Sequence, residues 1–106
     1  MKVLKFGGSS VAKPERIENI VSILKSYYSK GEKFAVIFSA FGGVTDSLID
    51  MAKLAADGDQ SYQTIFDKFS ARHSHVVQEL FNEEFQKQII PNIEENHEVL
   101  KNLLNG

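Results

Sequence analysis

Residues 5–11 read Lys5-Phe6-Gly7-Gly8-Ser9-Ser10-Val11, and they join a short apolar segment to a helix. The segment that leads into them, residues 2–6, is rich in β-forming residues and is stopped by the two glycines, which predicts a buried first strand. Pro14 follows a few residues later and suits the first turn of a helix. The start of the chain therefore predicts a strand, a glycine turn and a helix.

The next two elements continue this order. Between Pro14 and Lys30, apolar residues recur every three and four positions, which predicts an amphipathic helix closed by Gly31. Residues 34–38 form a continuous apolar run whose length and composition favour a strand covered on both faces. A strand–helix–strand order of this length predicts a parallel, right-handed βαβ unit.

Helical spacing of apolar residues predicts three further helices. The first begins near Thr45 or Asp46 and is broken at Gly58, and the second runs from about residue 61 to residue 85. Pro91 marks the boundary to the third. The predicted fold class is α/β, with a βαβα start (parallel strands 2–6 and 34–38) and a long helical hairpin, and it is mostly helical by residue count.

A sheet of only two parallel strands is not expected to be stable as an independent fold. Parallel sheets need cover on both faces and further strands to share the burial. The chain is therefore expected to be a piece of a larger fold or to pair with another copy of itself. In either case the isolated chain should self-associate or bind a hydrophobic dye.

Composition excludes several classes of protein. The net charge of −2 and the pI near 5.9 argue against a nucleic-acid binder, which would present a basic face. The absence of cysteine excludes disulfides, thiolate nucleophiles and cysteine metal sites. No apolar run approaches the length of a membrane span or a signal-peptide core, so a soluble cytoplasmic protein is the default expectation.

The glycine turn has a physical case for binding phosphate. Glycines let a ligand approach the backbone closely, and the amides that follow, with the first turn of the helix, offer N–H donors. Lys5 adds a positive charge suited to a transferring phosphoryl group, and Ser9 and Ser10 add hydroxyl donors. The alternative is a tight turn in which one of the serines caps the helix. The pattern is neither a Walker A loop, where Lys follows the glycines, nor the three-glycine dinucleotide fingerprint.

Residues 5–11 also resemble the N-terminal signature of aspartate kinases, in the amino-acid kinase superfamily. That signature is usually written Lys-Phe-Gly-Gly-Thr-Ser-Val, so Ser9 replaces Thr and keeps the hydroxyl. The resemblance implies that Lys5 is the catalytic residue that stabilises charge on the transferred phosphoryl group. It also implies that Lys5, Gly7, Gly8 and Ser9 bind the phosphates of ATP.

A second small-residue loop, residues 39–46, follows the second strand and opens a helix. Parallel strands place their carboxyl ends at one edge of a sheet, so both loops should face one crevice. Taken alone, the loop is slightly better explained by a helix start with Thr45 or Asp46 as N-cap. Residues 36–48, however, resemble a second aspartate-kinase signature, Val-Val-Ser-Ala-x-x-Gly-x-Thr-Asn/Asp-x-Leu. By that resemblance, Ser39 and Thr45 bind aspartate.

The resemblance covers the whole chain, strongly through about residue 56 and in pattern after it. It implies that residues 1–106 are an incomplete N-terminal part of an amino-acid kinase domain. The reaction implied is phosphorylation of the L-aspartate β-carboxylate by ATP, carried as its magnesium complex, to give 4-phospho-L-aspartate. This is the first step towards lysine, threonine and methionine. ATP and L-aspartate are then the small-molecule partners, and no prosthetic group, protein-held metal, nucleic acid or membrane is expected.

Other groups that the family needs would lie beyond Gly106, among them an Arg for the substrate carboxylate and the adenine-binding lobe. The isolated chain is therefore expected to be inactive. The longer protein is expected to be a homo-oligomer that carries either regulatory domains or a homoserine dehydrogenase. Two alternatives stay open: a kinase of another acidic amino acid, and a helical interaction module with an incidental glycine loop.

The remaining chemistry-bearing residues favour structural roles. His73 and His75 are two positions apart on a helix and share no face, which makes them a poor metal pair, and His97 is distant in sequence. The aromatic residues of the helix predicted from about residue 61 to residue 85 are expected in the core or in an interface; they are Tyr62, Phe66, Phe69, Phe81 and Phe85. Serine, histidine and aspartate are all present, but no nucleophile-elbow pattern supports a hydrolase.

Overall fold

The structure is a computed structural model that describes residues 1–106. The chain forms two compact units, Met1–Gly43 and Val44–Gly106, each considered by itself. Helices account for 67% of the residues, as the mostly helical prediction requires. The elements in chain order are β1 (Lys2–Phe6), α1 (Pro14–Ser29), β2 (Phe34–Phe38), α2 (Val44–Ala56), α3 (Tyr62–Leu80) and α4 (Glu83–Asn105).

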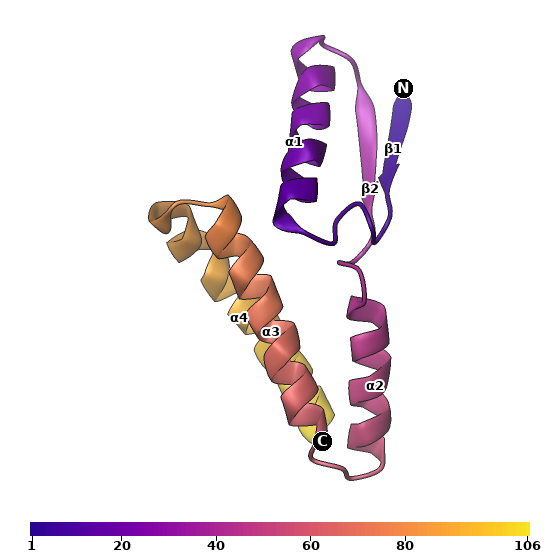
Figure 1. Ribbon diagram of the computed structural model, residues 1–106, viewed down its shortest axis with the longest axis vertical. Coiled ribbons are helices and arrows are strands. Elements are labelled where there is room, and N and C mark those ends of the chain that lie inside the picture. The colour runs from indigo at the N-terminus through magenta and orange to yellow at the C-terminus, as the bar shows by residue number, and fades with distance from the viewer. The chain divides into compact units, whose positions relative to one another are not determined.

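The first unit is a βαβ unit with a two-stranded parallel sheet (Figure 1). β1 and β2 have the predicted bounds and pair in register from Lys2 opposite Phe34 to Phe6 opposite Phe38. α1 lies against one face of this sheet, where the Tyr27 ring is 5.8 Å from the Phe34 ring and 5.1 Å from the Lys2 ammonium. Gly31, at φ 71°, follows α1 as predicted and takes a torsion that glycine adopts most easily.

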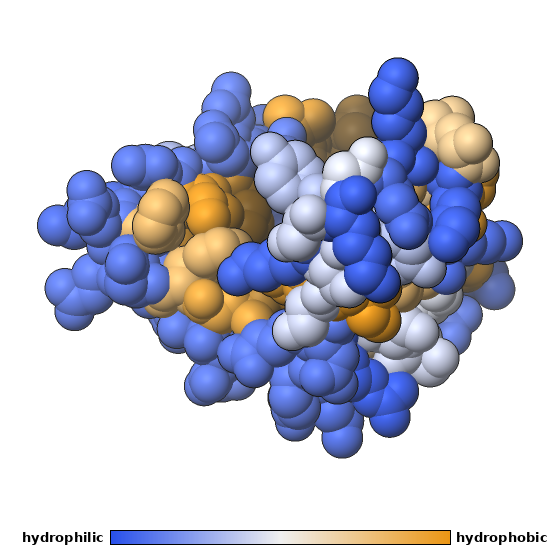
Figure 2. All heavy atoms as spheres, turned by 90° about the horizontal axis from the view of Figure 1, so that it is seen from above, coloured by the Kyte–Doolittle hydropathy of each residue, from blue (hydrophilic) through white to orange (hydrophobic).

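The other face of the sheet has no cover within this unit. Side chains alternate along a strand, so Val3, Lys5 and Ile37 project from the face opposite α1. Val3 is 60% exposed and Ile37 is 51% exposed. The prediction that the second strand is covered on both faces is therefore wrong for this chain, because α1 is the only helix of the unit. Figure 2 shows hydrophobic residues at the surface among hydrophilic ones. Whether the chain self-associates stays a prediction.

The second unit is built from three helices, and α3 and α4 form the predicted hairpin (Figure 1). α3 packs against both α2 and α4, and α2 also contacts α4. The centre of the core is Met51, which is fully buried and packs with the buried rings of Tyr62 and Phe66. The Tyr62 hydroxyl donates to Asn105 Oδ1 at 2.6 Å and ties the start of α3 to the end of α4. No helix combines the length and the apolar character of a membrane span.

The hairpin turn lies earlier than the sequence pattern predicted. α3 ends at Leu80 rather than near residue 85, and α4 begins at Glu83 and runs through Pro91. Asn82 explains the position of the turn, because its side chain accepts a hydrogen bond from the Phe85 N–H at 3.0 Å as an N-cap. The predicted helix boundary at Pro91 is wrong, because α4 continues through this residue and packs along α3.

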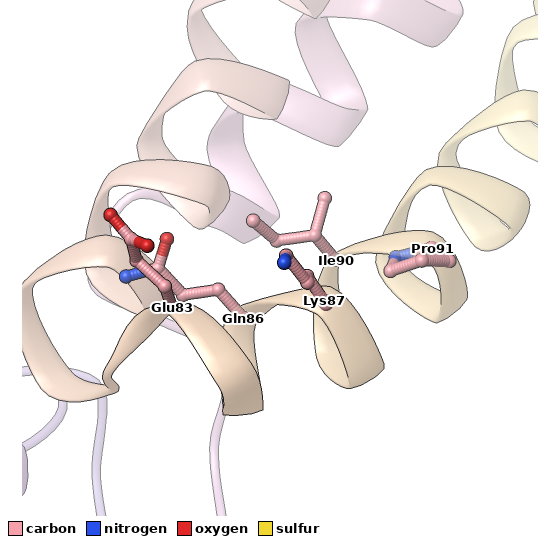
Figure 3. A pocket seen from close by; sticks show the side chains of 5 residues that line it. All are labelled: Glu83, Gln86, Lys87, Ile90 and Pro91. Atoms are coloured by element: carbon pink, nitrogen blue, oxygen red, sulfur yellow. The ribbon is translucent and has the colours of Figure 1, made fainter.

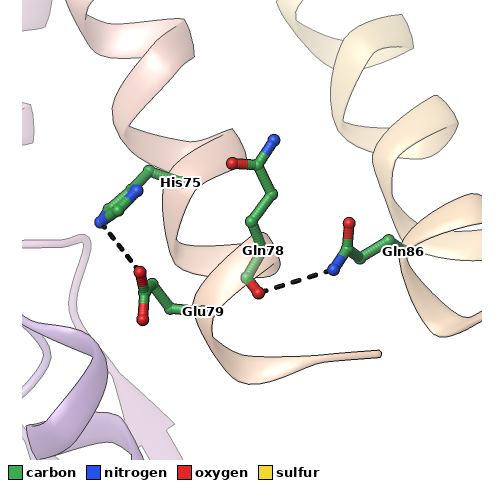
Figure 4. Close-up of polar contacts among 4 residues, drawn as sticks. All are labelled: His75, Gln78, Glu79 and Gln86. Carbon is green, nitrogen blue, oxygen red and sulfur yellow. Dashed lines mark hydrogen bonds and ion pairs between the residues drawn. The ribbon is translucent and has the colours of Figure 1, made fainter. Parts of the chain in front are cut away.

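The turn is also held by a side chain on α4. The Gln86 amide donates to the Phe81 carbonyl oxygen at 2.7 Å. It also donates to the Gln78 carbonyl oxygen at 3.5 Å (Figure 4). These bonds satisfy carbonyl groups at the end of α3 that have no partner inside the helix. Phe81 and Phe85 lie at this turn and are 40% and 52% exposed. The prediction that the aromatic residues lie in the core or in an interface is confirmed for Tyr62 and Phe66, which are in the core. Phe81 and Phe85 are outside the core, and an interface for them stays a prediction.

Candidate functional site

The glycine turn after β1 is a compact hydrogen-bonded turn. The Ser10 N–H donates to the Gly7 carbonyl oxygen at 3.0 Å. Neither Gly7 nor Gly8 has a positive φ, so the backbone conformation itself does not require glycine at either position. A Cβ atom on Gly7 would meet no protein atom within 4 Å. Neither torsion nor packing within the protein therefore accounts for glycine at position 7.

The turn carries a series of N–H donors with no partner in the protein. No hydrogen bond within the chain uses the N–H groups of Gly7, Gly8 or Ser9. Successive backbone N–H groups in a turn are a donor type that binds anions in proteins. The Ser9 side chain is exposed and its hydroxyl is not engaged either. The turn thus offers the donor set that phosphate binding needs.

The helix that follows contributes less than the sequence suggested. α1 begins at Pro14, which has no N–H, with Lys13 as its N-cap residue. The N–H groups of Arg16 and Ile17 both donate to the Lys13 carbonyl oxygen, at 3.1 and 3.2 Å. The expected donors of the first helical turn are therefore largely used. The alternative in which Ser9 or Ser10 caps the helix is wrong, because the helix starts too far along the chain.

The second predicted loop lies against the first. The Ser39 N–H, directly after β2, donates to the Phe6 carbonyl oxygen at 3.0 Å. A Cβ atom on Gly42 would lie only 3.2 Å from the Gly8 carbonyl oxygen, and one on Gly8 would lie 3.5 Å from the Gly42 Cα. The two loops are therefore in backbone contact at one edge of the sheet, and they bring Ser39 beside the turn of Gly7, Gly8 and Ser9.

The two other predicted site residues belong to regular elements and not to the loops, Lys5 to β1 and Thr45 to α2. Lys5 pairs with Ile37 in the sheet, and its exposed side chain projects from the uncovered face without an ion pair. Thr45 is an exposed residue of α2 and belongs to the second unit. α2 begins at Val44, after Gly43 at φ 84°, so Thr45 and Asp46 are in the first helical turn rather than at the predicted N-cap.

Arg16 is a residue of this region that the sequence patterns did not single out. Its Nη1 donates to the Ser9 carbonyl oxygen at 2.6 Å. It also lines a pocket of about 220 Å³ together with Ser10 and Asn19, over a floor of Phe6, Ile20 and Ile23. The only signal for it was a cation in the first turn of the helix after the glycine turn, and such cations are common on exposed helix surfaces.

A pocket of about 380 Å³ lies on α4 and is lined by none of the predicted site residues. Figure 3 shows its lining, which comes from α4 alone: Glu83, Gln86, Lys87, Ile90 and Pro91. No motif of the sequence falls there. A groove with one helical wall gives a small ligand little enclosure, so the strand-end loops remain the candidate site.

His73 and His75 have separate surroundings, as their spacing predicted. His75 pairs with Glu79 on the exposed side of α3 at 3.7 Å (Figure 4). His73 and His97 instead meet between α3 and α4, with ring centroids 5.2 Å apart. His97 Nδ1 lies 3.1 Å from the Ser70 hydroxyl. Burial lowers the pKa of His97, the neighbouring His73 lowers it further, and Glu94 opposes the change.

Comparison with known proteins gives consistent matches. Residues 1–101 match the model of the amino acid kinase family. An aspartate kinase of Pseudomonas fluorescens is 47% identical over 58 residues, which cover 55% of this chain and 14% of the relative. A chloroplastic bifunctional aspartokinase/homoserine dehydrogenase of Daucus carota is 29% identical over 100 residues, which cover 94% of this chain and 11% of the relative.

A solved structure gives the same result for the fold. The aspartate kinase of Clostridium acetobutylicum superposes with a TM-score of 0.67 at 26% identity, over 90% of this chain and 23% of that enzyme. The α/β fold class predicted from the sequence is thereby confirmed, as is the resemblance to aspartate kinases. The chain spans less than a quarter of each of these three relatives.

Proposed function

Since the chain belongs to the amino acid kinase family, we propose that it supplies part of the ATP and aspartate sites of an enzyme that phosphorylates L-aspartate. The observation that carries this proposal is the turn of Gly7, Gly8 and Ser9. Three successive N–H groups there have no partner in the protein, and position 7 holds a glycine that packing and torsion leave unexplained. Close approach of a phosphate accounts for both features.

The proposed reaction is a single phosphoryl transfer. A β-carboxylate oxygen of aspartate attacks the γ-phosphorus of ATP, the bond from that phosphorus to the bridging oxygen breaks, and ADP leaves with 4-phospho-L-aspartate as the product. Catalysis of this kind depends on positioning and on neutralising charge. Lys5 is assigned to the charge on the transferred group, and the glycine turn to the phosphates. Ser39 and Thr45 are assigned to aspartate.

ATP enters as its magnesium complex, so the metal arrives with the substrate. No prosthetic group is required for a transfer of this type. The product is an acyl phosphate, which is activated for a following reaction at the same carbon. This chemistry fits the entry to the biosynthesis of lysine, threonine and methionine. The chain by itself is proposed to bind phosphate without turnover, and its uncovered sheet face is proposed to make it self-associate.

A chimera tests the activity. Residues 1–106 would replace the segment that superposes on them in the Clostridium acetobutylicum enzyme. Hydroxylamine converts an acyl phosphate to a coloured hydroxamate, so the product can be followed directly. We expect hydroxamate formation that depends on both ATP and L-aspartate, and its loss in Lys5→Ala. The unfused chain should release no ADP above background.

A matched variant shows whether the loss is specific. Lys2→Ala removes a cation of the same strand, whose side chain projects from the other face of the sheet. It should leave turnover largely unchanged in a chimera that folds as judged by circular dichroism. A folded chimera without aspartate-dependent turnover would contradict the proposal. So would one in which Lys5→Ala and Lys2→Ala behave alike.

A further inference from the structure

We propose that Arg16 is a positioning residue that fixes the shape of the anion-binding turn and adds positive charge beside it. The part concerning the anion rests on the proposed function of the turn. The observation that carries the inference is the bond from Arg16 Nη1 to the Ser9 carbonyl oxygen, at 2.6 Å. A short bond from a charged donor is stronger than one between neutral groups.

The peptide group between Ser9 and Ser10 is bonded on both of its edges. Its carbonyl oxygen accepts from Arg16, and its N–H donates to the Gly7 carbonyl oxygen at 3.0 Å. A trans peptide is planar and its C=O and N–H point in opposite directions, so these two bonds together set the orientation of the plane. The neighbouring N–H groups, those of Gly7, Gly8 and Ser9, are then left in a defined geometry with no protein partner.

Arg16 is itself anchored and carries an uncompensated charge. It lies in the first turn of α1, where its own N–H donates to the Lys13 carbonyl oxygen. It forms no ion pair, and its planar guanidinium has further donors besides the one used by Ser9. The same side chain lines the 220 Å³ pocket with Ser10 and Asn19. Its charge therefore lies beside the turn, at hydrogen-bond distance from the Ser9 carbonyl oxygen.

Two variants and one control separate an effect of Arg16 on the shape of the turn from an effect of its positive charge alone. Arg16→Gln removes both the charge and the guanidinium N–H donors, and Arg16→Lys keeps the charge but loses the planar guanidinium geometry. Lys25→Gln removes an equal charge from an exposed site farther along α1. Each is made in the chain of residues 1–106. Hydrogen exchange of the Ser10 amide is measured without ligand, and inorganic tripolyphosphate is then titrated while the amide signals of residues 7–11 are followed.

Arg16→Gln should speed exchange of the Ser10 amide and weaken tripolyphosphate binding about tenfold, the scale of one charge-assisted hydrogen bond. Arg16→Lys should recover part of the affinity, and Lys25→Gln should change it by less than about twofold because salt screens distant exposed charges. Amides at the end of α1 should exchange at the normal rate in all three variants, which shows that the helix stays folded.

The outcomes are distinguishable. Unchanged Ser10 exchange together with unchanged affinity in Arg16→Gln overturns the inference, and so does equal weakening by Arg16→Gln and Lys25→Gln. If the unaltered chain fails to bind tripolyphosphate at residues 7–11, the proposed function of the turn fails. The exchange rate of the Ser10 amide alone then decides whether Arg16 positions the turn.

Discussion

The contact between the two glycine loops makes a sharp prediction about two alanine substitutions. In Gly42→Ala, the new Cβ would lie 3.2 Å from the Gly8 carbonyl oxygen and 3.4 Å from the Ala12 Cβ. The nearest of these is a backbone atom, so it cannot rotate away and the loops must shift by a few tenths of an ångström. In Gly7→Ala, the new Cβ would meet nothing within 4 Å.

The magnitudes follow from two opposing effects. Forcing an extra carbon into a packed site costs about 1–3 kcal/mol, and a glycine-to-alanine change stabilises by about 0.4–1 kcal/mol through the unfolded chain when the torsion is compatible. Both effects apply at Gly42, which gives a net destabilisation of about 1 kcal/mol. Only the second applies at Gly7, whose φ is not positive, so Gly7→Ala should stabilise by up to about 1 kcal/mol.

The assay is urea unfolding followed through the amide signals of Met1–Gly43, because the two compact units need not unfold together. The difference between the two variants is the decisive quantity, since it cancels most errors of extrapolation. We expect Gly42→Ala to be less stable than Gly7→Ala by about 2 kcal/mol. Equal stability of the two variants would refute the inferred contact between the loops.

Three further predictions concern the second unit. Met51→Ala removes the fully buried centre of the core and should cost about 2–5 kcal/mol, measured by urea unfolding. Asn82→Ala removes the cap that accepts the Phe85 N–H and should cost about 1 kcal/mol; no loss would contradict the assignment of the hairpin turn. Burial, and to a smaller extent His73, hold the pKa of His97 below its ordinary value of 6.5. As the pH falls, His97 is therefore protonated in the unfolded chain at a higher pH than in the folded chain. Stability should therefore fall as the pH drops below about 6.5, and His97→Gln should reduce that fall; an identical fall in the variant would count against the prediction.

The strands and the strand-end loops could be predicted closely from the sequence. The first strand is stopped by Gly7 and Gly8, the second is a continuous apolar run of five residues, and both have the predicted bounds. The contact between the loops also follows from the parallel order, since it places both strand ends at one edge. The roles of Lys5, Ser9, Ser39 and Thr45 stay predictions from the resemblance.

The parts that could not be predicted depend on tertiary contacts. Pro91 is a helix breaker by local rules, but packing on α3 carries α4 through it, whereas the real turn is set by the modest capping signal of Asn82. Arg16 was missed because an exposed arginine on a helix is common, and only its bond to Ser9 distinguishes it. The prediction that strand 34–38 is covered on both faces was wrong, because the sequence of an apolar strand does not show whether the covering elements are present in the same chain.

The most direct measurement of the central claim is a titration of the isotope-labelled chain of residues 1–106 with magnesium-ATP, followed by amide signals. We expect saturable shifts at Gly7, Gly8 and Ser9, with smaller ones at Ser39 in the adjoining loop, and none on α4. Saturable shifts confined to α4, or none at the glycine turn at millimolar nucleotide, would contradict the claim.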